Sequence, residues 1–240
     1  MAVIETSKLS KIYNKENIPV YALNEVDLTI EAGEFTSIVG PSGSGKTTML
    51  NMIGGLDKPT HGTVTVKDTD LGTLSDSQLI DFRLHHIGFV FQAFNLIPVL
   101  TALENISFLL QMQGRSEKEC RQRSEELLES VGLKERMHNR PNQLSGGQQQ
   151  RVAVARALAS KPDFVLADEP TASLDSKSSG NLLDMMLKLN EEQKVTFIFS
   201  THDPRVIKRA RRVVVLEDGK IIQDQQKESG IPYEPYSLTE

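Results

Sequence analysis

The stretch Gly40-Pro41-Ser42-Gly43-Ser44-Gly45-Lys46-Thr47 fits the pattern G-x-x-x-x-G-K-[ST]. An apolar run at 35–39 predicts a strand before it, and residues 46–53 read as a helix after it. In that context the glycine-rich backbone turns its N–H groups toward phosphate oxygens, and the helix adds its positive end. The pattern therefore predicts a nucleotide site in which Lys46 reaches the β- and γ-phosphates and the Thr47 hydroxyl ligates Mg²⁺. We expect Thr48 to belong to the same site.

A pair of acids supplies the second half of this chemistry. The apolar run 164–167 predicts a strand that ends in Asp168 and Glu169. Ligands of open α/β sheets bind at the carboxyl ends of the strands, so we expect these acids to face the nucleotide. Asp168 would hold Mg²⁺, through water, and Glu169 would polarise the attacking water. Two solvated acids at a strand end would be an ordinary feature without the glycine-rich stretch.

A second glycine pair stands in Leu144-Ser145-Gly146-Gly147-Gln148, directly before a helical stretch at 149–159. Ser145 suits a helix N-cap, and the glycines leave backbone N–H groups unshielded at the positive end of a helix. This predicts a second phosphate site, made by Ser145, Gly146, Gly147 and Gln148. Two such sites for one nucleotide suggest that each nucleotide touches two copies of the protein. By itself, the stretch would read as a helix start after a flexible turn.

The remaining pattern alternates strands and helices. Strands are predicted at 26–30, 63–66, 87–91, 195–199 and 213–216, and helices at 176–189 and after Asp203-Pro204. Apolar residues at helical spacing between 101 and 159 predict a mostly helical insertion. Near-continuous apolar strands that alternate with helices are typical of a mainly parallel sheet covered on both faces, so the fold class is α/β.

Composition limits the function classes. The chain has 240 residues, enough for one large domain, with 38% hydrophobic and 25% charged residues, as in an ordinary globular protein. A net charge of −5 argues against a protein that coats nucleic acid. The single cysteine, Cys120, excludes an intramolecular disulfide, fits a reduced compartment, and reads as an incidental surface thiol.

The sequence contains no apolar run near the roughly 18 residues that cross a bilayer. The first nine residues also lack the apolar core of a secretory signal. If the protein serves a membrane, we expect it to do so from outside, through a partner.

Taken together, these motifs and their order resemble an ABC-type ATPase domain from Val3 to about Gln223. The resemblance implies a P-loop NTPase core with a mainly parallel sheet, an N-terminal antiparallel β subdomain and a helical insertion at about 93–160. It implies one nucleotide-binding domain at 1–225, followed by a polar tail at 226–240. ATP and Mg²⁺ are the implied cofactors.

The family's other functional positions can be carried over where this sequence matches them. Tyr13 matches the aromatic residue that stacks on adenine, and Gln92 matches the glutamine that reaches Mg²⁺ and the attacking water and reports to the membrane partner. Ser173-Leu174-Asp175 match the loop that crosses the dimer interface, so Asp175 is counted with the nucleotide site. His202 matches the histidine that contacts the γ-phosphate. The implied catalytic set is Lys46, Gln92, Glu169 and His202, and the implied metal ligands are Thr47, Gln92 and Asp168.

The resemblance also implies partners and a place in the cell. The implied assembly is a homodimer of the ATPase domain under transmembrane permease subunits, peripheral on the cytoplasmic face of the inner membrane, with no nucleic acid partner. Segments 51–60, 88–98 and 101–105 look like the ATPases of the lipoprotein-releasing and macrolide-exporter group. The implied function is therefore lipoprotein release, or export of macrolides, peptides or lipids.

Other interpretations remain open at this point. A cell-division-type ABC ATPase would signal across the membrane without transport, and a soluble DNA-repair ABC ATPase is disfavoured because no long coiled coil or zinc insertion interrupts the chain. The apolar cluster Phe94, Leu96, Ile97, Val99 and Leu100 reads either as a groove for a short permease helix or as packing of the helical insertion. The basic residues at 205–212 read as a solvated helix face.

Overall fold

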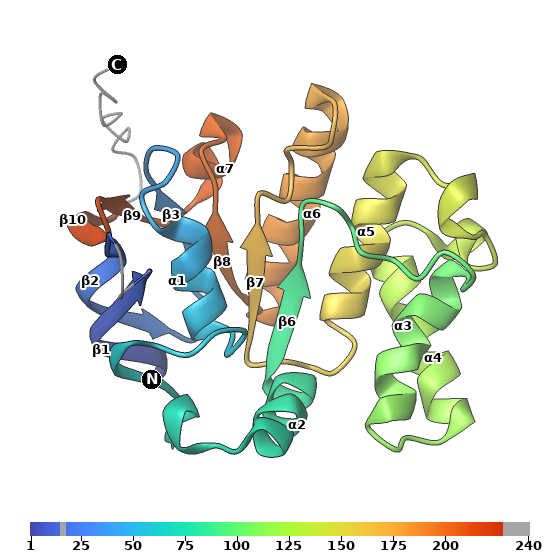
Figure 1. Cartoon of the computed structure of the whole chain (residues 1–240). Helices are drawn as coiled ribbons and strands as arrows, with labels where there is room; N and C mark the ends of the chain where they lie inside the picture. Colours follow the sequence, from blue (N-terminus) through green and yellow to red (C-terminus); the bar gives the residue numbers. More distant parts are fainter. Residues whose placement is uncertain (15–17, 228–240) are drawn as a thin grey trace.

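Two β-sheets organise the chain, and α-helices cover the larger one (Figure 1). The computed structural model describes residues 1–14 and 18–227. The smaller sheet has the strand order β2-β1-β4-β5, and every pair in it is antiparallel. Its strands are β1 (Ala2–Tyr13), β2 (Val20–Glu31), β4 (His61–Val66) and β5 (Thr69–Asp70). This is the antiparallel subdomain that the resemblance implies.

The larger sheet has the order β10-β9-β3-β8-β7-β6 and is parallel except for its edge strand β10. Its strands are β3 (Phe35–Val39), β6 (Ile87–Val90), β7 (Phe164–Asp168), β8 (Thr196–Ser200), β9 (Arg212–Glu217) and β10 (Lys220–Gln226). β10 reaches Gln226, the first residue of the predicted tail, and the tail beyond Lys227 lies outside the described residues.

Seven α-helices and three short 3₁₀ turns connect the strands in the described part of the chain. The helices are α1 (Lys46–Ile53), α2 (Asp76–His86), α3 (Ala102–Met112), α4 (Glu117–Ser130), α5 (Gly146–Ala157), α6 (Ser176–Gln193) and α7 (Pro204–Arg209). The 3₁₀ turns are η1 (Leu71–Thr73), η2 (Lys134–Arg136) and η3 (Pro141–Gln143). Within the described residues, no helix combines the length and the apolar character that a membrane span needs.

The period-two alternation of the central strands divides the core into two layers. In β8, Phe197 and Phe199 pack into the cluster shared with α3 to α6, while Ile198 packs into the cluster shared with α1 and the antiparallel sheet. All three side chains are fully buried. The sheet is thus covered on both faces, which explains why its inner strands β3, β7, β8 and β9 are mostly apolar and buried, whereas the edge strand β10 is polar and mostly exposed.

The helical insertion contains one correction to the sequence prediction. Cys120 is buried in the core of the insertion and is not a surface thiol, because it shares a face of α4 with Ser124 and Leu127 at spacings of four and three residues. Burial raises the pKa of its thiol. The charged neighbours that suggested exposure, Glu117, Lys118, Glu119 and Arg121, are themselves exposed.

The insertion joins the core through a close contact between α5 and β6. A Cβ atom added at Gly88 in β6 would lie 2.6 Å from the carbonyl oxygen of Ala157 at the end of α5. α5 can approach the strand this closely only because residue 88 has no side chain.

We therefore expect Gly88→Ala to destabilise the protein by about 1–3 kcal/mol, through forced separation of α5 from β6. At roughly 2–4 °C per kcal/mol for a chain of this size, the melting temperature in a thermal unfolding scan should fall by several degrees. Gly180→Ala is the matched control, because it lies in α6 and an added Cβ would meet nothing within 4 Å. Equal melting temperatures for the two variants would contradict the close-packing argument.

Candidate active site

The glycine-rich stretch lies at the carboxyl end of β3, directly before α1. Gly40 has φ 153° and Gly45 has φ 104°, values that side chains rarely allow. A Cβ at Gly40 would lie 2.0 Å from the carbonyl oxygen of Leu216, and one at Gly45 would lie 2.2 Å from that of Ala22. Both glycines are therefore required by conformation and by space, and the loop presents its backbone to the pocket.

Lys46 begins α1 and bends back over this loop. Its Nζ atom donates hydrogen bonds to the carbonyl oxygens of Gly40, at 2.9 Å, and Pro41, at 2.8 Å. Burial lowers the pKa of the Lys46 ammonium, and the nearby charges of Glu169 and Asp168 oppose that shift. A cation at the mouth of a backbone cradle is suited to hold a phosphate group.

The predicted metal ligands converge from three elements: the start of α1, the end of β7 and the segment after β6. Thr47 Oγ1 lies 3.3 Å from each carboxylate oxygen of Asp168, which β7 delivers at its carboxyl end. Gln92 follows β6, the neighbouring strand, and lines the same pocket as Thr47. Hydroxyl, carboxylate and amide oxygens are the hard ligands that Mg²⁺ prefers.

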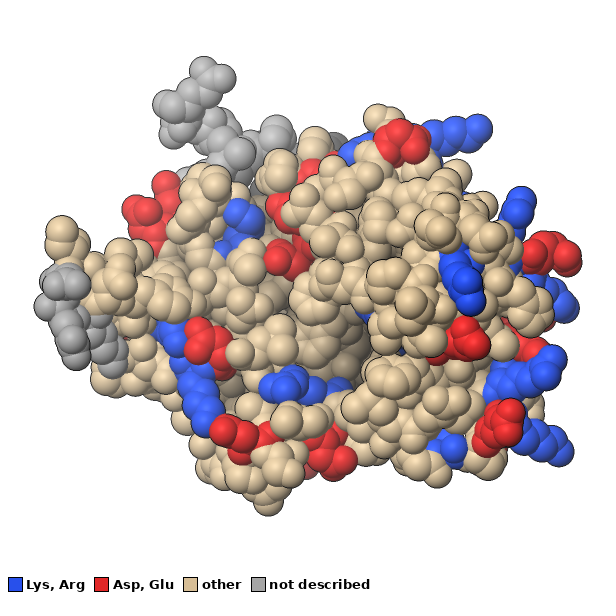
Figure 2. Space-filling view, turned by 45° about the vertical axis from the view of Figure 1, so that its right-hand side comes forward, with Lys and Arg blue, Asp and Glu red and all other residues tan. Residues whose placement is uncertain are grey.

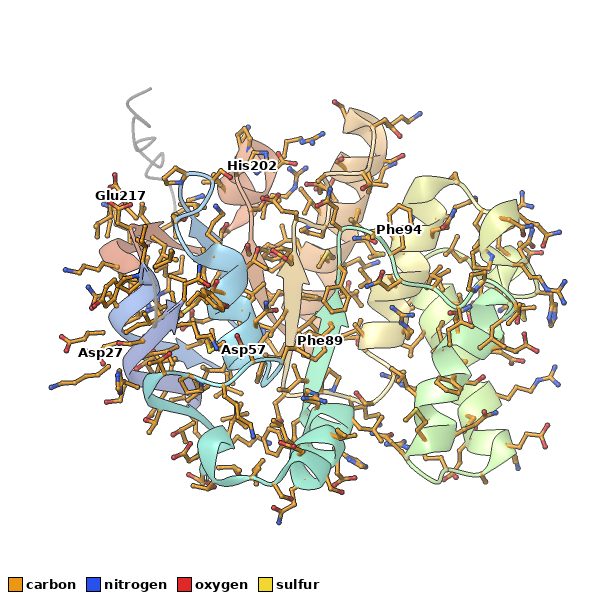
Figure 3. All side chains as sticks on the ribbon, in the orientation of Figure 1. Asp27, Asp57, Phe89, Phe94, His202 and Glu217 are labelled. Atoms are coloured by element: carbon orange, nitrogen blue, oxygen red, sulfur yellow. The ribbon has the colours of Figure 1, made fainter. Side chains whose placement is uncertain are left out.

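Glu169 stands at the sharp turn after β7. Its backbone has φ 45°, in the left-handed region that is strained for a side-chain-bearing residue. Its carboxylate accepts a hydrogen bond from Thr201 Oγ1 at 2.9 Å and one from His202 Nδ1 at 2.7 Å. His202 follows β8 and lies near the upper end of the sheet in Figure 3.

These groups surround one cavity of about 750 Å³, large enough for a nucleotide. The sequence-predicted residues that line it come from the loop after β3 and from the ends of β6, β7 and β8: Gly40, Pro41, Ser42, Gly43, Gly45, Lys46, Thr47, Thr48, Gln92, Glu169 and His202. Ser44 belongs to the same loop but is buried beneath it, and Asp168 contacts the site through Thr47.

The second predicted phosphate site has the expected local form. Ser145 caps α5, and its side chain and that of Gln148 exchange hydrogen bonds with each other's backbone N–H groups. The helix begins at Gly146, earlier than the sequence predicted. Asp175 caps the neighbouring helix α6, and a Cβ at Gly147 would touch Ser178 in that helix at 3.0 Å. Neither Ser145 to Gln148 nor Asp175 lines the cavity of the same chain.

Tyr13 is not among the residues that line the cavity. Its hydroxyl donates to Asp57 Oδ2 at 3.2 Å, and Lys11 Nζ lies 5.1 Å from the centre of its ring. Lys11 and Asp57 also form an ion pair at 2.7 Å. On β2, Val20 is the direct cross-strand partner of Tyr13, and Val20 does line the cavity.

Comparison with known proteins identifies the family. The family model described as ABC transporter matches residues 23–172. The chain is 48% identical over 228 residues to the ABC transporter ATP-binding protein MJ0796 of Methanocaldococcus jannaschii, covering 93% of this chain and 97% of that one. It superposes on a dimeric post-hydrolysis structure of MJ0796 with ADP and Pi at a TM-score of 0.84, with 47% identity, covering 93% of this chain and 98% of that one.

This chain belongs to the ABC transporter ATPase family. It is 42% identical to the lipoprotein-releasing system protein LolD of Idiomarina loihiensis, covering 93% of this chain and 98% of that protein. It is 44% identical to the macrolide export protein MacB of Rhodopirellula baltica, covering 92% of this chain and a third of that longer protein. The expected fold and family membership are therefore confirmed.

Several walls of the cavity in this ABC ATPase were not predicted from the sequence. Val20, Tyr21 and Ala22 reach it from β2, and Ser200 reaches it from the end of β8. Thr201, next to Ser200, contacts Glu169 directly. No sequence motif marks Val20, Tyr21 or Ala22 on β2. Thr201 could have been predicted, because it follows a predicted strand and directly precedes His202.

The loop after β8 is held by a buried carboxylate. Asp203 accepts hydrogen bonds from Arg205 and, at 2.6 Å, from Thr171 Oγ1. Burial favours the neutral acid, but these hydrogen bonds outweigh it and lower the pKa of Asp203. The folded-state pKa of Asp203 lies below the unfolded value of about 3.9. The ionised carboxylate therefore stabilises the folded protein above about pH 4, and this stabilisation is lost as the pH falls further.

Asp203→Asn should therefore lower the melting temperature most at pH 7, by several degrees at about 2–4 °C per kcal/mol. The difference from the wild type should shrink as the pH falls below about 4, because the unfolded wild-type chain then binds a proton that the folded chain takes up only at lower pH. Asp184→Asn, which removes an exposed partner of Arg209, is the control and should change little. A wild-type advantage that stays constant from pH 7 to pH 3 would refute the ionised role.

Proposed function

We propose that this ABC ATPase hydrolyses ATP at two composite sites, each made by the glycine-rich cradle of one copy and the α5 N-terminus of another. The observation that carries this proposal is the separation of the two phosphate-binding features within one chain. The cradle lines the cavity, whereas Ser145, Gly146 and Gly147 lie outside it on the helical insertion. A second copy can bring its α5 N-terminus to the phosphate that protrudes from the first.

Mg²⁺ fits the ligand set around Thr47. Thr47 and Asp168 already approach each other, and Gln92 lines the same cavity, so oxygen donors from three elements meet beside the cradle. When bound there, the ion would neutralise charge on the phosphates. Thr47, Gln92 and Asp168 are the residues that would hold it.

The reaction we propose is attack of water on the γ-phosphate of ATP, with ADP as the leaving group. The backbone of the cradle and Lys46 bind the phosphates and stabilise the charge that develops on them. Glu169 accepts a hydrogen bond from the attacking water and orients it, and His202 contacts the γ-phosphate. The α5 N-terminus and Asp175 of the second copy complete the enclosure.

The base of the nucleotide lies, in this proposal, toward β1 and β2. Tyr13 stacks on adenine, supported by its pairing with Asp57 and Lys11. Its strand pairing with Val20, which lines the cavity, is compatible with that role. Tyr21, which lines the cavity, adds a second aromatic wall.

ATP-driven joining and release of the two copies is the mechanical output, and a permease uses it on the cytoplasmic face of the membrane. Similarity to LolD and MacB supports lipoprotein release or macrolide export as the process served, and export of peptides or lipids is the wider form of the same proposal. Residues 1–225 form the nucleotide-binding domain in this proposal, with the helical subdomain at about 93–160. The permease, which contacts the cargo, selects the substrate.

An apolar groove of about 350 Å³ lies between α2, β6 and α3 and offers a docking place for a helix of the permease. Its exposed apolar side chains include Leu56, Ile80 and Met112, with Phe89 and Phe91 at its base. Figure 2 shows a hollow in the middle of this face, surrounded mostly by uncharged surface. An amphipathic helix that lays its apolar face in such a groove is a common recognition mode.

The groove differs from the cluster suggested by the sequence. Leu96 packs against the core, and Arg156 donates hydrogen bonds to the carbonyl oxygens of Phe94 and Asn95, which fixes that loop on α5. Val99, in contrast, is 71% exposed and adjoins the loop. The two surfaces can therefore be tested separately.

Glu169→Gln should reduce ATP turnover by at least about 10²-fold, because the amide cannot orient water as the carboxylate does, while ATP binding persists. Size-exclusion chromatography with ATP should then show a trapped dimer. Lys46→Ala is the contrasting variant, because it should lose tight nucleotide binding in a titration and stay monomeric. Wild-type turnover by Glu169→Gln, or a monomer at saturating ATP, would refute the composite site.

Ile80→Glu and Met112→Glu should abolish co-purification of the permease from detergent-solubilised membranes, since a buried charge in an apolar interface is costly. ATP-dependent dimerisation of the soluble chain should be unaffected in the Glu169→Gln background. Val99→Glu is the matched control on the neighbouring loop. If Val99→Glu disrupts the complex and the two groove variants do not, the docking surface is the loop at 94–100.

A further inference from the structure

The Glu169 carboxylate has two hydrogen-bond partners of different character. His202 donates from an imidazole that is 73% exposed, while Thr201 donates from a side chain that is completely buried. The Glu169 side chain itself is 19% exposed, so most of it is fixed by protein. Of the two partners, Thr201 is the one whose position packing determines.

The hydroxyl of Thr201 is directed by its own surroundings. Its Oγ1 atom accepts a hydrogen bond from the Asp203 backbone N–H at 3.0 Å. A hydroxyl has one hydrogen to donate, and here it points to Glu169 Oε2. Threonine is β-branched and stiff at χ1, so the donor direction is constrained as well.

Asp203 is anchored in turn. Its carboxylate accepts from the Arg205 backbone and guanidinium at 2.8–3.1 Å and from the buried Thr171 hydroxyl at 2.6 Å. Thr171 lies in the segment between Glu169 and Asp175, two residues beyond the acid that it helps to place. A closed hydrogen-bond network therefore leads from the segment after Glu169 back to its carboxylate.

We propose that Thr201 is the positioning residue that aims the Glu169 carboxylate at the attacking water. The proposal rests on the role given to Glu169 above. The left-handed backbone at Glu169 is strained for a residue with a side chain and persists only where its surroundings hold it, and Thr201 is a buried donor that does so. Each carboxylate oxygen has a second lone-pair direction, so Glu169 can still accept a hydrogen bond from water while Thr201 holds it.

The test compares Thr201→Val, which removes the hydroxyl at nearly constant shape, with Thr201→Ser, which keeps it. In the full chain with its permease, Thr201→Val should lower kcat by about 10²-fold with KM and ATP affinity unchanged, because misplacing a catalytic group by about 1 Å has effects of that size. Thr201→Ser should recover most of the rate. Thr201→Val should also trap the ATP-bound dimer, as Glu169→Gln does.

A double variant separates positioning from general structure. In the Glu169→Gln background, Thr201→Val should cause no further loss of the residual rate, because both changes act through the same carboxylate. A multiplicative loss, an unchanged kcat in Thr201→Val, or equal losses in the Val and Ser variants would each overturn the proposal. If Thr201→Val does not fold by circular dichroism, Thr201→Ala undergoes the same measurements under the same criteria. Wild-type turnover by Glu169→Gln would instead refute the role of Glu169, independently of Thr201.

Discussion

The nucleotide site depends on one constraint: the glycine-rich loop lies very close to the backbone of β9 on one side and of β2 on the other. Gly40 faces the Leu216 carbonyl of β9, and Gly45 faces the Ala22 carbonyl of β2. Gly219, in the turn after β9, donates to the Ser44 carbonyl and accepts from the Asn24 N–H. The loop is thus also the joint between the two sheets. A side chain at Gly45 would push the loop away from the antiparallel sheet, and one at Gly40 would push it away from β9.

The sequence predicted the bounds of β3 and α1 correctly, because a buried strand, a glycine loop and a helix follow each other without a gap. It did not predict α2, although Ser75 and Gln78 form a capping box that the pattern S-x-x-Q displays. Leu79 is the single buried residue of that helix, so helical periodicity in apolar residues was absent. Periodicity detects helices that pack deeply, and α2 lies on the surface.

The residues of the candidate site also differ in how well the sequence predicted them. Residues within contiguous motifs, such as Lys46 and Glu169, were found because their chemistry shows in the sequence. Val20 and Tyr21 were not, because they reach the cavity through the packing of β2 against the glycine-rich loop and the turn after β9, which brings together residues far apart in the chain. Bulges in the pairing of β2 with β1 also shift the register several times. No local sequence pattern therefore shows which β2 residues face the cavity.

The helix that carries the proposed second phosphate site, α5, is hydrogen-bonded to the segment after β6 and to the segment after β7. Gln150 of α5 is fully buried, and its amide donates to the carbonyl oxygens of Phe91, at 3.2 Å, and Pro170, at 2.8 Å. Phe91 precedes Gln92 and lines the apolar groove, and Pro170 follows Glu169. If α5 moves when its N-terminus meets the nucleotide of another copy, these carbonyls must follow or lose buried hydrogen bonds, at about 1–3 kcal/mol each. The segments next to the groove and next to Glu169, the acid proposed to orient water, are therefore both bonded to α5, so a displacement of α5 would disturb both.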